Sequence, residues 1–396
     1  MDIYLDSAAT TKPKQEVIDA MMPYFTDKWY NPSSLYLNAS NVKNDIKNAK
    51  KIIADYIGAQ EDEIYFTSGG SESNCWAIQG FVNYCHKNNK CPAIITTRIE
   101  HKSILDCVDN VNANTFYIDV DKFGFVNEED LSECLMYCEE AGYTTLVSIQ
   151  MANNEIGTIQ YIRRLSNIVH LYHAILHTDA VQAFGKQLIN VNNYYVDLMS
   201  VSGHKFGCPK GIGFLYIRNG IEIEPLIYGT QMNGMRGGTE NVPYIIGMAK
   251  AVELLDNYST KHLTQTFVQS EIKHFIAIAK FNEALINKFG CKINGATSNL
   301  NRVHGIMSYR FPNNIHIESL ILMLDMDEIY ISAGSACNTY SDKPSHVLKA
   351  IGLSDEECMR TMRLSFEYNS LTEEKVDKFI SSLEKAINIM KVDVDI

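Results

Sequence analysis

The sequence is poor in proline, in basic residues and in long apolar stretches. Its 396 residues include 9 prolines and 23 glycines, too few for a disordered or collagen-like chain. Lys and Arg number 35 against 47 Asp and Glu, a formal net charge of −12, which argues against sequence-independent binding to nucleic-acid phosphates. No apolar run approaches the ~20 residues of a membrane helix, and the N-terminus lacks the basic region of a signal peptide. We therefore expect a globular, cytoplasmic protein with neither a nucleic-acid nor a membrane partner.

The 10 cysteines do not form a recognisable framework. Their spacing is irregular and includes no C-x-x-C pair, so we expect reduced thiols, as is usual in the cytoplasm. His170, His173 and His177 suggest a metal cluster at first sight. We discount that cluster because a predicted change from helix to strand separates the three side chains, and no nearby thiol completes a tetrahedral set.

Between residues 60 and 217, short β-rich runs alternate with helical patterns. The predicted strands cover residues 63–67, 93–97, 115–118, 145–150, 174–177, 196–201 and 213–217, and the predicted helices cover residues 71–87, 103–111, 127–140 and 162–173. This alternation is typical of an α/β fold with a mainly parallel, mixed sheet covered by helices. Ligands of such sheets bind at the carboxyl ends of the strands, so the residues that follow each strand deserve inspection.

The length of the chain exceeds one compact core and predicts two domains. Residues 240–290 have the pattern of long helices. They are followed by predicted strands at 303–311 and 329–332 and predicted helices at 317–326 and 372–390. We assign residues 16–258 to a large domain, and residues 1–15 together with 259–396 to a smaller α/β domain.

Three polar segments follow predicted strands. Residues 68–73 (SGGSES) open a helix with glycines and free N–H groups, which indicates an anion site or a simple capping turn with Ser71 as the N-cap. Asp179 either caps a helix or holds a proton on a cofactor ring nitrogen. Lys205, within residues 202–206 (SGHKF), is either a surface lysine or a Schiff-base former in a desolvated site. Together they supply what pyridoxal phosphate requires: a phosphate cradle, an acid for the pyridine nitrogen and a lysine for the aldehyde.

Other polar residues are candidates for the substrate side of such a site. His101 either stacks on a flat ring and relays protons or is an ordinary loop histidine. Cys337 lies in a run of small residues, where a thiol is more reactive than in a core. Arg363 stands in an apolar setting, where it forms a structural ion pair or a bidentate clamp on a carboxylate.

In these motifs the sequence closely resembles the cysteine desulfurases of the NifS/IscS type, which are class V aminotransferase-like, fold-type-I pyridoxal-phosphate enzymes. The matching motifs are residues 5–11 (LDSAATT), 31–34 (NPSS), 67–74 (TSGGSESN), 100–102 (EHK), 153–157 (NNEIG), 177–182 (HTDAVQ), 202–206 (SGHKF), 235–241 (MRGGTEN), 334–337 (GSAC) and 362–365 (MRLS). They run nearly from end to end. The stretch from Cys337 to residue 348 is similar to the subgroup with a long cysteine loop.

The resemblance implies a role for each candidate. The catalytic residues would be Lys205, which binds the cofactor and removes the Cα proton, Cys337, the nucleophile that takes up sulfur as a persulfide, and His101. The cofactor would be bound by Gly70, Ser71, His101, Asp179, Gln182, Ser202, His204, Lys205 and Thr239. Of these, Asp179 would pair with the pyridinium nitrogen, Gln182 with the ring hydroxyl oxygen, and Thr239 with the phosphate of the neighbouring subunit. Asn154 and Arg363 would hold the substrate carboxylate.

The same resemblance implies the reaction and the partners. A homodimer would convert L-cysteine to L-alanine and pass the sulfur to an acceptor or scaffold protein, for iron–sulfur clusters or thiolated tRNA. A selenocysteine lyase or related lyase on the same scaffold is an alternative, against which Cys337 argues. A non-catalytic thiol-rich sulfur relay or redox sensor is another, against which Lys205 and Asp179 argue.

Three departures from the family pattern bear on the site. Cys208 stands where the family usually has glycine, three residues beyond Lys205. Residues 231–233 (QMN) replace a run that usually carries a charged pair, close to Thr239. Glu367 replaces a usual small residue after the Arg363 segment.

Overall fold

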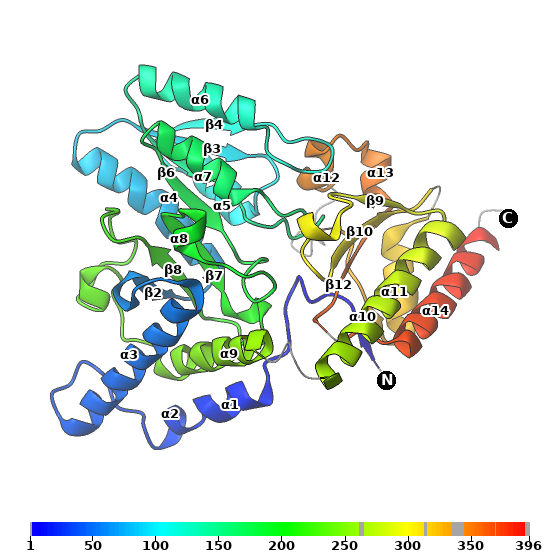
Figure 1. Ribbon diagram of the computed structural model, residues 1–396, viewed down its shortest axis with the longest axis horizontal. Coiled ribbons are helices and arrows are strands. Elements are labelled where there is room, and N and C mark those ends of the chain that lie inside the picture. The colour runs from blue at the N-terminus through cyan, green and yellow to red at the C-terminus, as the bar shows by residue number, and fades with distance from the viewer. Residues whose placement is uncertain (1, 261–264, 313–314, 335–343, 369, 393–396) are drawn as a thin grey trace.

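A computed structural model of the chain describes residues 2–260, 265–312, 315–334, 344–368 and 370–392 (Figure 1). Cys337 therefore lies outside the described residues. Within these ranges, we find no helix that is both long and apolar enough to cross a membrane.

The larger of the main sheets has seven strands and carries the mainly parallel, mixed arrangement that the sequence predicts. Its order is β2 (Ile64–Thr67), β8 (Gly213–Ile217), β7 (Leu198–Ser202), β6 (Ile175–Asp179), β5 (Thr144–Ser148), β3 (Pro92–Thr97) and β4 (Asn114–Ile118). Strand β8 runs antiparallel to both of its neighbours, β2 and β7, and the other neighbouring pairs of this sheet are parallel. Each predicted strand of this sheet is confirmed, and each of its ends lies within two residues of the observed end. Strand β6 continues through Asp179, which is its last residue rather than the start of a loop.

Helices cover both faces of this sheet because successive strand residues point to opposite sides. In β3, Ile94 packs with α4 (Gly70–Lys87) and α5 (Lys102–Asn110), whereas Ile95 packs in the core on the other face. That other face is covered by α3 (Leu37–Ile57), α6 (Glu128–Glu140), α7 (Ile162–Leu171) and α9 (Val242–Thr260). Short helices α1 (Gln15–Met21), α2 (Pro23–Thr26) and α8 (Val191–Tyr194) complete this part of the chain.

A second sheet stands beside the first, on the right in Figure 1. It consists of β12 (Thr361–Ser365), β10 (Ile306–Arg310) and β9 (Lys292–Asn294), all antiparallel. Its helices are α10 (Gln265–Glu283), α11 (Ile317–Met326), α12 (His346–Ala350), α13 (Asp355–Met359) and α14 (Glu373–Val392). This sheet has a separate core, in which Phe281, Tyr309 and Phe379 are buried together. The domain boundaries given above stay a prediction.

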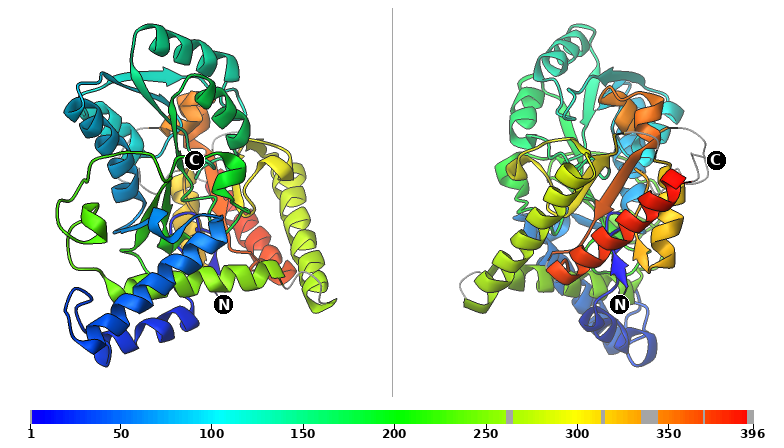
Figure 2. Two further views of the ribbon diagram at one scale, coloured as in Figure 1. Left: turned by 60° about the vertical axis from the view of Figure 1, so that its left-hand side comes forward. Right: turned by 90° about the vertical axis from the view of Figure 1, so that its right-hand side faces the viewer.

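The N-terminal segment links the two parts of the molecule. Strand β1 (Ile3–Tyr4) pairs in parallel with β11 (Ile329–Tyr330), and Figure 2 shows the blue N-terminal strand among elements from the end of the chain. Farther along, the backbone N–H of Thr11 donates to the carbonyl of His204 at 2.8 Å. The residues between these two contacts therefore lie over the carboxyl end of β7, where the sequence predicts a site.

Candidate active site

A cavity of about 320 Å³ lies at the carboxyl ends of β6 and β7. Of the residues predicted for the site, the cavity is lined by Gly70, Ser71, His101, Asn154, Asp179, Gln182, Ser202, His204, Lys205 and Arg363. Thr239 is not among the lining residues, and Cys337 lies outside the described part of the chain. Residues from positions 70 to 363 thus meet in one cavity, which sequence spacing alone does not require.

Lys205 is held in the cavity by the N-terminal segment. It ends a short 3-10 turn, Gly203–Lys205, that follows directly on β7. Its Nζ donates to the carbonyl oxygens of Ala8 at 2.7 Å and Ala9 at 2.8 Å. The amine is half-buried and oriented by fixed acceptors, so it is not the solvated surface lysine of the plainer interpretation.

Asp179 is buried at the end of β6 and accepts two hydrogen bonds. Its Oδ1 accepts from the backbone N–H of Val181 at 2.9 Å, a local capping bond, and its Oδ2 accepts from Asn74 Nδ2 at 2.8 Å. The carboxylate therefore caps a turn and not a helix, and it lines the cavity, where its role toward a ring nitrogen stays a prediction.

Asn74 connects Asp179 to His101 through Ser103. Asn74 Nδ2 donates to Ser103 Oγ at 2.9 Å, and the Ser103 backbone N–H donates to His101 Nδ1 at 3.1 Å. Because Nδ1 accepts a backbone N–H, the proton of the neutral ring belongs on Nε2. The sequence analysis assigned no role to Asn74 or Ser103. The available signal was the position of Asn74 one helical turn after Gly70, on the same helix face.

The start of α4 forms one end of the cavity. The helix begins at Gly70 with Gly69 as N-cap, so the prediction of Ser71 as N-cap is wrong. Gly69 has φ 155, a conformation that side chains disfavour, and this allows the helix to begin a residue earlier. A Cβ at Gly70 would lie 2.8 Å from Val181 Cγ2, so glycine is required there. The N–H groups of a first helical turn have no intrahelical acceptor and attract an anion.

Ser202 and His204 stand at this same end. Ser202 is the last residue of β7, and His204 Nδ1 lies 3.1 Å from Thr10 Oγ1. Burial, together with the charges of Lys205 and Lys210, lowers the pKa of His204 to about 4. His204 is therefore neutral at pH 7 and carries a single ring N–H to donate.

Arg363 lies in the middle of β12 and is 1% exposed. Its Nη2 forms an ion pair with Asp6 Oδ1 at 2.6 Å, and its Nη1 donates to the backbone carbonyl of Asn154 at 3.2 Å. Its Nε is buried without a hydrogen-bond partner within the described ranges. The structural ion pair is thus present, and the side chain also lines the cavity, where the carboxylate clamp stays a prediction.

Two buried acids belong to this region although the sequence analysis gave them no role. Glu155 lines the cavity and accepts a hydrogen bond from Ser345 Oγ. Glu100 accepts from Thr97 Oγ1 at 2.7 Å, and its burial raises its pKa well above the usual range. Its backbone carbonyl lies 2.8 Å from His346 Nε2. Both acids lie inside motifs quoted above, at residues 100–102 and 153–157, and this position was the sequence signal that could have identified them.

The remaining candidates lie apart from the cavity. Thr239 is exposed on the segment between β8 and α9. Cys208 is fully buried, and burial raises the pKa of its thiol, so its position after Lys205 does not make it reactive.

The histidines that suggested a metal cluster have other partners. His170 pairs with Asp197 at 2.8 Å, and His177 contacts two serines. In the part of the chain that the structure describes, no group of His, Cys, Asp and Glu could hold a metal ion.

The donors and acceptors in the cavity fit pyridoxal phosphate. The first turn of α4, Ser202 and the neutral His204 supply donors for a phosphate. The carboxylate of Asp179 stands on one side of the cavity, and the amine of Lys205 is within the same space. This set combines the three functions that the cofactor needs from a protein.

Comparisons with known proteins agree with this chemistry. The aminotransferase class-V family matches residues 3–379. Cysteine desulfurase IscS of Methanosarcina thermophila is 38% identical over 402 residues, covering 98% of this chain and 93% of that relative. A solved NifS-like protein has a TM-score of 0.86 and 32% identity, covering 98% of this chain and 100% of its own. SspA in complex with cysteine has a TM-score of 0.77 and 34% identity, covering 92% and 99%. The chain therefore belongs to the aminotransferase class-V family, among the cysteine desulfurases of the NifS/IscS type.

Proposed function

We propose that this protein is a pyridoxal-phosphate-dependent cysteine desulfurase that converts L-cysteine to L-alanine and carries the released sulfur as a persulfide on Cys337. The observation that carries the proposal is the meeting of Lys205, Asp179 and the start of α4 in one cavity. The full-length similarity to cysteine desulfurases supports it.

Each residue of the cavity then has a stated task toward the cofactor. Lys205 would hold the cofactor aldehyde through Nζ, Asp179 would pair with the ring nitrogen, and His101 would stack on the ring. Gln182 Nε2 has two hydrogens, of which one goes to the Ala8 carbonyl at 2.9 Å, so the other is available for the ring hydroxyl oxygen. Gly70, Ser71, Ser202 and His204 hold the phosphate. When bound, the cofactor stabilises negative charge on the Cα of an attached amino acid.

Other residues of the cavity orient the substrate and transfer its protons. The guanidinium of Arg363, which lines the cavity, binds the substrate carboxylate, and the Asn154 side chain assists it. Lys205 Nζ removes the Cα proton. The Cys337 thiolate forms a bond to the substrate sulfur while the carbon–sulfur bond breaks and its electron pair stays on carbon. Protonation of that carbon and return of a proton to Cα give alanine, and the sulfur remains on Cys337 as a persulfide.

A homodimer accounts for residues that the single chain leaves exposed. Trp29, Leu35 and Tyr228 are large apolar side chains on the surface, with Leu35 fully exposed. Where such side chains gather into a patch, they mark interfaces between proteins. Thr239, also exposed, would reach the phosphate of the neighbouring subunit. A sulfur-acceptor protein for iron–sulfur clusters or tRNA thiolation, the two-domain division and the cytoplasmic location belong to the same proposal.

The test is the colour and the chemistry of a lysine variant. The purified protein should be yellow, and Lys205→Ala should lose the visible absorption of the bound cofactor together with alanine formation from L-cysteine. Lys210→Ala is the matched control, because Lys210 is an exposed lysine of the same segment. A visible band that is unchanged in Lys205→Ala would overturn the proposal.

A further inference from the structure

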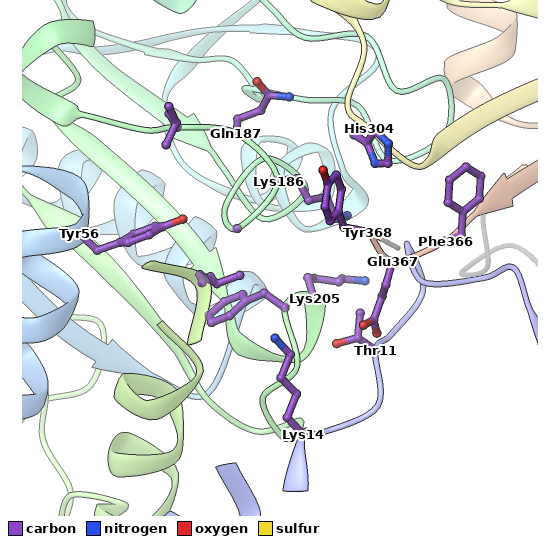
Figure 3. Close-up of a pocket in the computed structure, with 14 residues that line it drawn as sticks. Thr11, Lys14, Tyr56, Lys186, Gln187, Lys205, His304, Phe366, Glu367 and Tyr368 are labelled. Carbon is purple, nitrogen blue, oxygen red and sulfur yellow. The ribbon is translucent and has the colours of Figure 1, made fainter. Parts of the chain in front are cut away.

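A second cavity, of about 300 Å³, lies behind Lys205 (Figure 3). Lys205 lines both cavities, so the candidate active site and this second space both border on this residue. The second cavity has an unusual concentration of titratable side chains, contributed by Lys14, Tyr56, Lys186, Lys205, His304, Glu367 and Tyr368. None of them except Lys205 was predicted to act in the site.

The lysines and the one carboxylate of this cavity shift each other's pKa values. Burial raises the pKa of Glu367, while the charges of Lys14 and Lys186 oppose that rise. Burial, together with the charges of Lys205 and Arg363, lowers the pKa of Lys186 to about 7, and the charge of Glu367 opposes this shift. His304 is neutral at pH 7, since burial lowers its pKa to about 4. Three lysines, Lys14, Lys186 and Lys205, therefore share this cavity with one carboxylate, that of Glu367.

Lys186 is connected to Lys205 through a continuous set of hydrogen bonds. Lys186 Nζ donates to Gln182 Oε1 at 2.9 Å. Gln182 Nε2 in turn donates to the Ala8 carbonyl at 2.9 Å, the carbonyl to which Lys205 Nζ also donates. Turning the Gln182 amide over would place its NH2 group against the ammonium and its oxygen against the carbonyl, so both bonds would be lost.

We propose that Lys186 is a positioning residue of the active site, which holds the Gln182 amide with Nε2 toward the cofactor and places a positive charge behind Lys205, with Glu367 as its counter-ion. The inference rests on the proposed function, because it concerns the cofactor side of Gln182. Glu367, a departure from the family pattern, thereby gains a role. Its negative charge opposes the lowering of the Lys186 pKa by burial.

Two effects of Lys186 act in the same direction on the bound cofactor. The fixed amide donates to the ring oxygen and stabilises its anionic form. The nearby positive charge disfavours an additional proton on the nitrogen that joins Lys205 to the cofactor. Removal of Lys186 therefore raises the pH at which the visible band of the loaded protein titrates.

The experiment is a spectroscopic pH titration of the cofactor-loaded protein in the absence of substrate. Lys186→Met should raise the midpoint of the visible band by about one pH unit, and Lys186→Arg should leave it near the wild-type value. Lys43→Met, which removes a lysine charge from an exposed position on α3, should change nothing. In a Gln182→Ala background, the Lys186→Met shift should shrink, because part of it acts through the amide.

Glu367→Gln provides an independent variant that keeps the lysine. It removes the counter-ion and should lower the charge on Lys186 at neutral pH, so the midpoint should shift in the same direction as in Lys186→Met but by less. This variant carries the test if Lys186→Met fails to fold. A normal midpoint in both Lys186→Met and Glu367→Gln would overturn this inference. Because these variants keep the visible band and Lys205→Ala loses it, failure here is distinguishable from failure of the proposed function.

Discussion

Arg363 and Asp6 form an ion pair of 2.6 Å between the strand β12 and the N-terminal segment, 357 positions apart in the chain. The guanidinium side chain is 2% exposed. The pair fixes the N-terminal segment, whose next residues, Ala8 and Ala9, accept the hydrogen bonds of Lys205. The substrate side and the lysine side of the cavity are therefore positioned by one short segment.

Arg363→Lys should weaken cysteine use far more than cofactor binding. An ammonium cannot reproduce the separate Nη and Nε donors of a guanidinium, so kcat/KM for L-cysteine should fall at least about tenfold, or about 1.4 kcal/mol. Cofactor affinity, measured by absorbance titration, should change little. Asp6→Asn is the control, because it removes the ion pair and leaves the guanidinium in place. Equal losses of cofactor and substrate affinity in Arg363→Lys would show a purely structural role.

Cys337→Ser should separate the carbon chemistry from the sulfur chemistry. The variant should stay yellow and change its spectrum on addition of cysteine, but form little alanine and hold no persulfide, since a hydroxyl is a poor nucleophile toward sulfur. The measurement is alanine and sulfide release, with mass spectrometry of the protein.

Two further thiol variants serve as controls for Cys337→Ser. Cys208→Ser should stay active, because the Cys208 thiol is buried and its pKa is raised. Cys75→Ser matters as well, because a hydrogen bond from Cys107 lowers the pKa of Cys75 to about 7, and such thiols react more readily. Wild-type alanine release by Cys337→Ser would assign the protein to the lyases.

The exposed apolar side chains near α2 and α3 predict a dimer. Light scattering should give twice the chain mass, and Leu35→Asp should shift the protein toward monomer and reduce activity, because a charge at a buried interface is costly. Leu171→Asp is the matched control, since Leu171 is also an exposed leucine, at the end of α7. Thr239→Ala should weaken cofactor binding without changing the mass. An active monomer would contradict the role of Thr239.

Acidification should destabilise the protein through its buried histidines. His177 is fully buried between Ser148 and Ser200, and burial lowers its pKa from 6.5 to about 3. Between these two values the unfolded chain binds more protons than the folded chain. Stability is therefore complete above pH 6.5 and falls as the pH decreases toward 3. His204 and His304, with pKa values lowered to about 4, act in the same direction.

The contribution of His177 can be isolated by a variant. At about pH 5 it should amount to about 2 kcal/mol of lost unfolding free energy. In thermal melts across this range, His177→Gln should have a lower melting temperature than wild type at pH 7 but a shallower decline with acidification. Parallel pH profiles for the two proteins would contradict the assignment.

Much of the fold could be predicted because local patterns determine it. The apolar runs of the seven-stranded sheet and the helices between them follow residue periodicity, and α11 begins and ends where the pattern does. Other elements were missed for physical reasons. Strand β1 has two residues and exists only through its pairing with β11, and β12 follows a short helix without a strong turn signal.

The candidate residues themselves were evident from the sequence, because a glycine-rich helix start, a carboxylate and a lysine after successive strands carry their chemistry in their types and positions. Sequence could not decide whether Arg363 forms an ion pair or a clamp, since the answer depends on Asp6 at the other end of the chain. Nor could it find the contact of Lys186 with Gln182, which depends on how side chains from one loop turn behind Lys205. Local chemistry was thus determined by the sequence alone. The tertiary structure decided which polar groups share a desolvated space, because only folding brings distant segments to within hydrogen-bond distance.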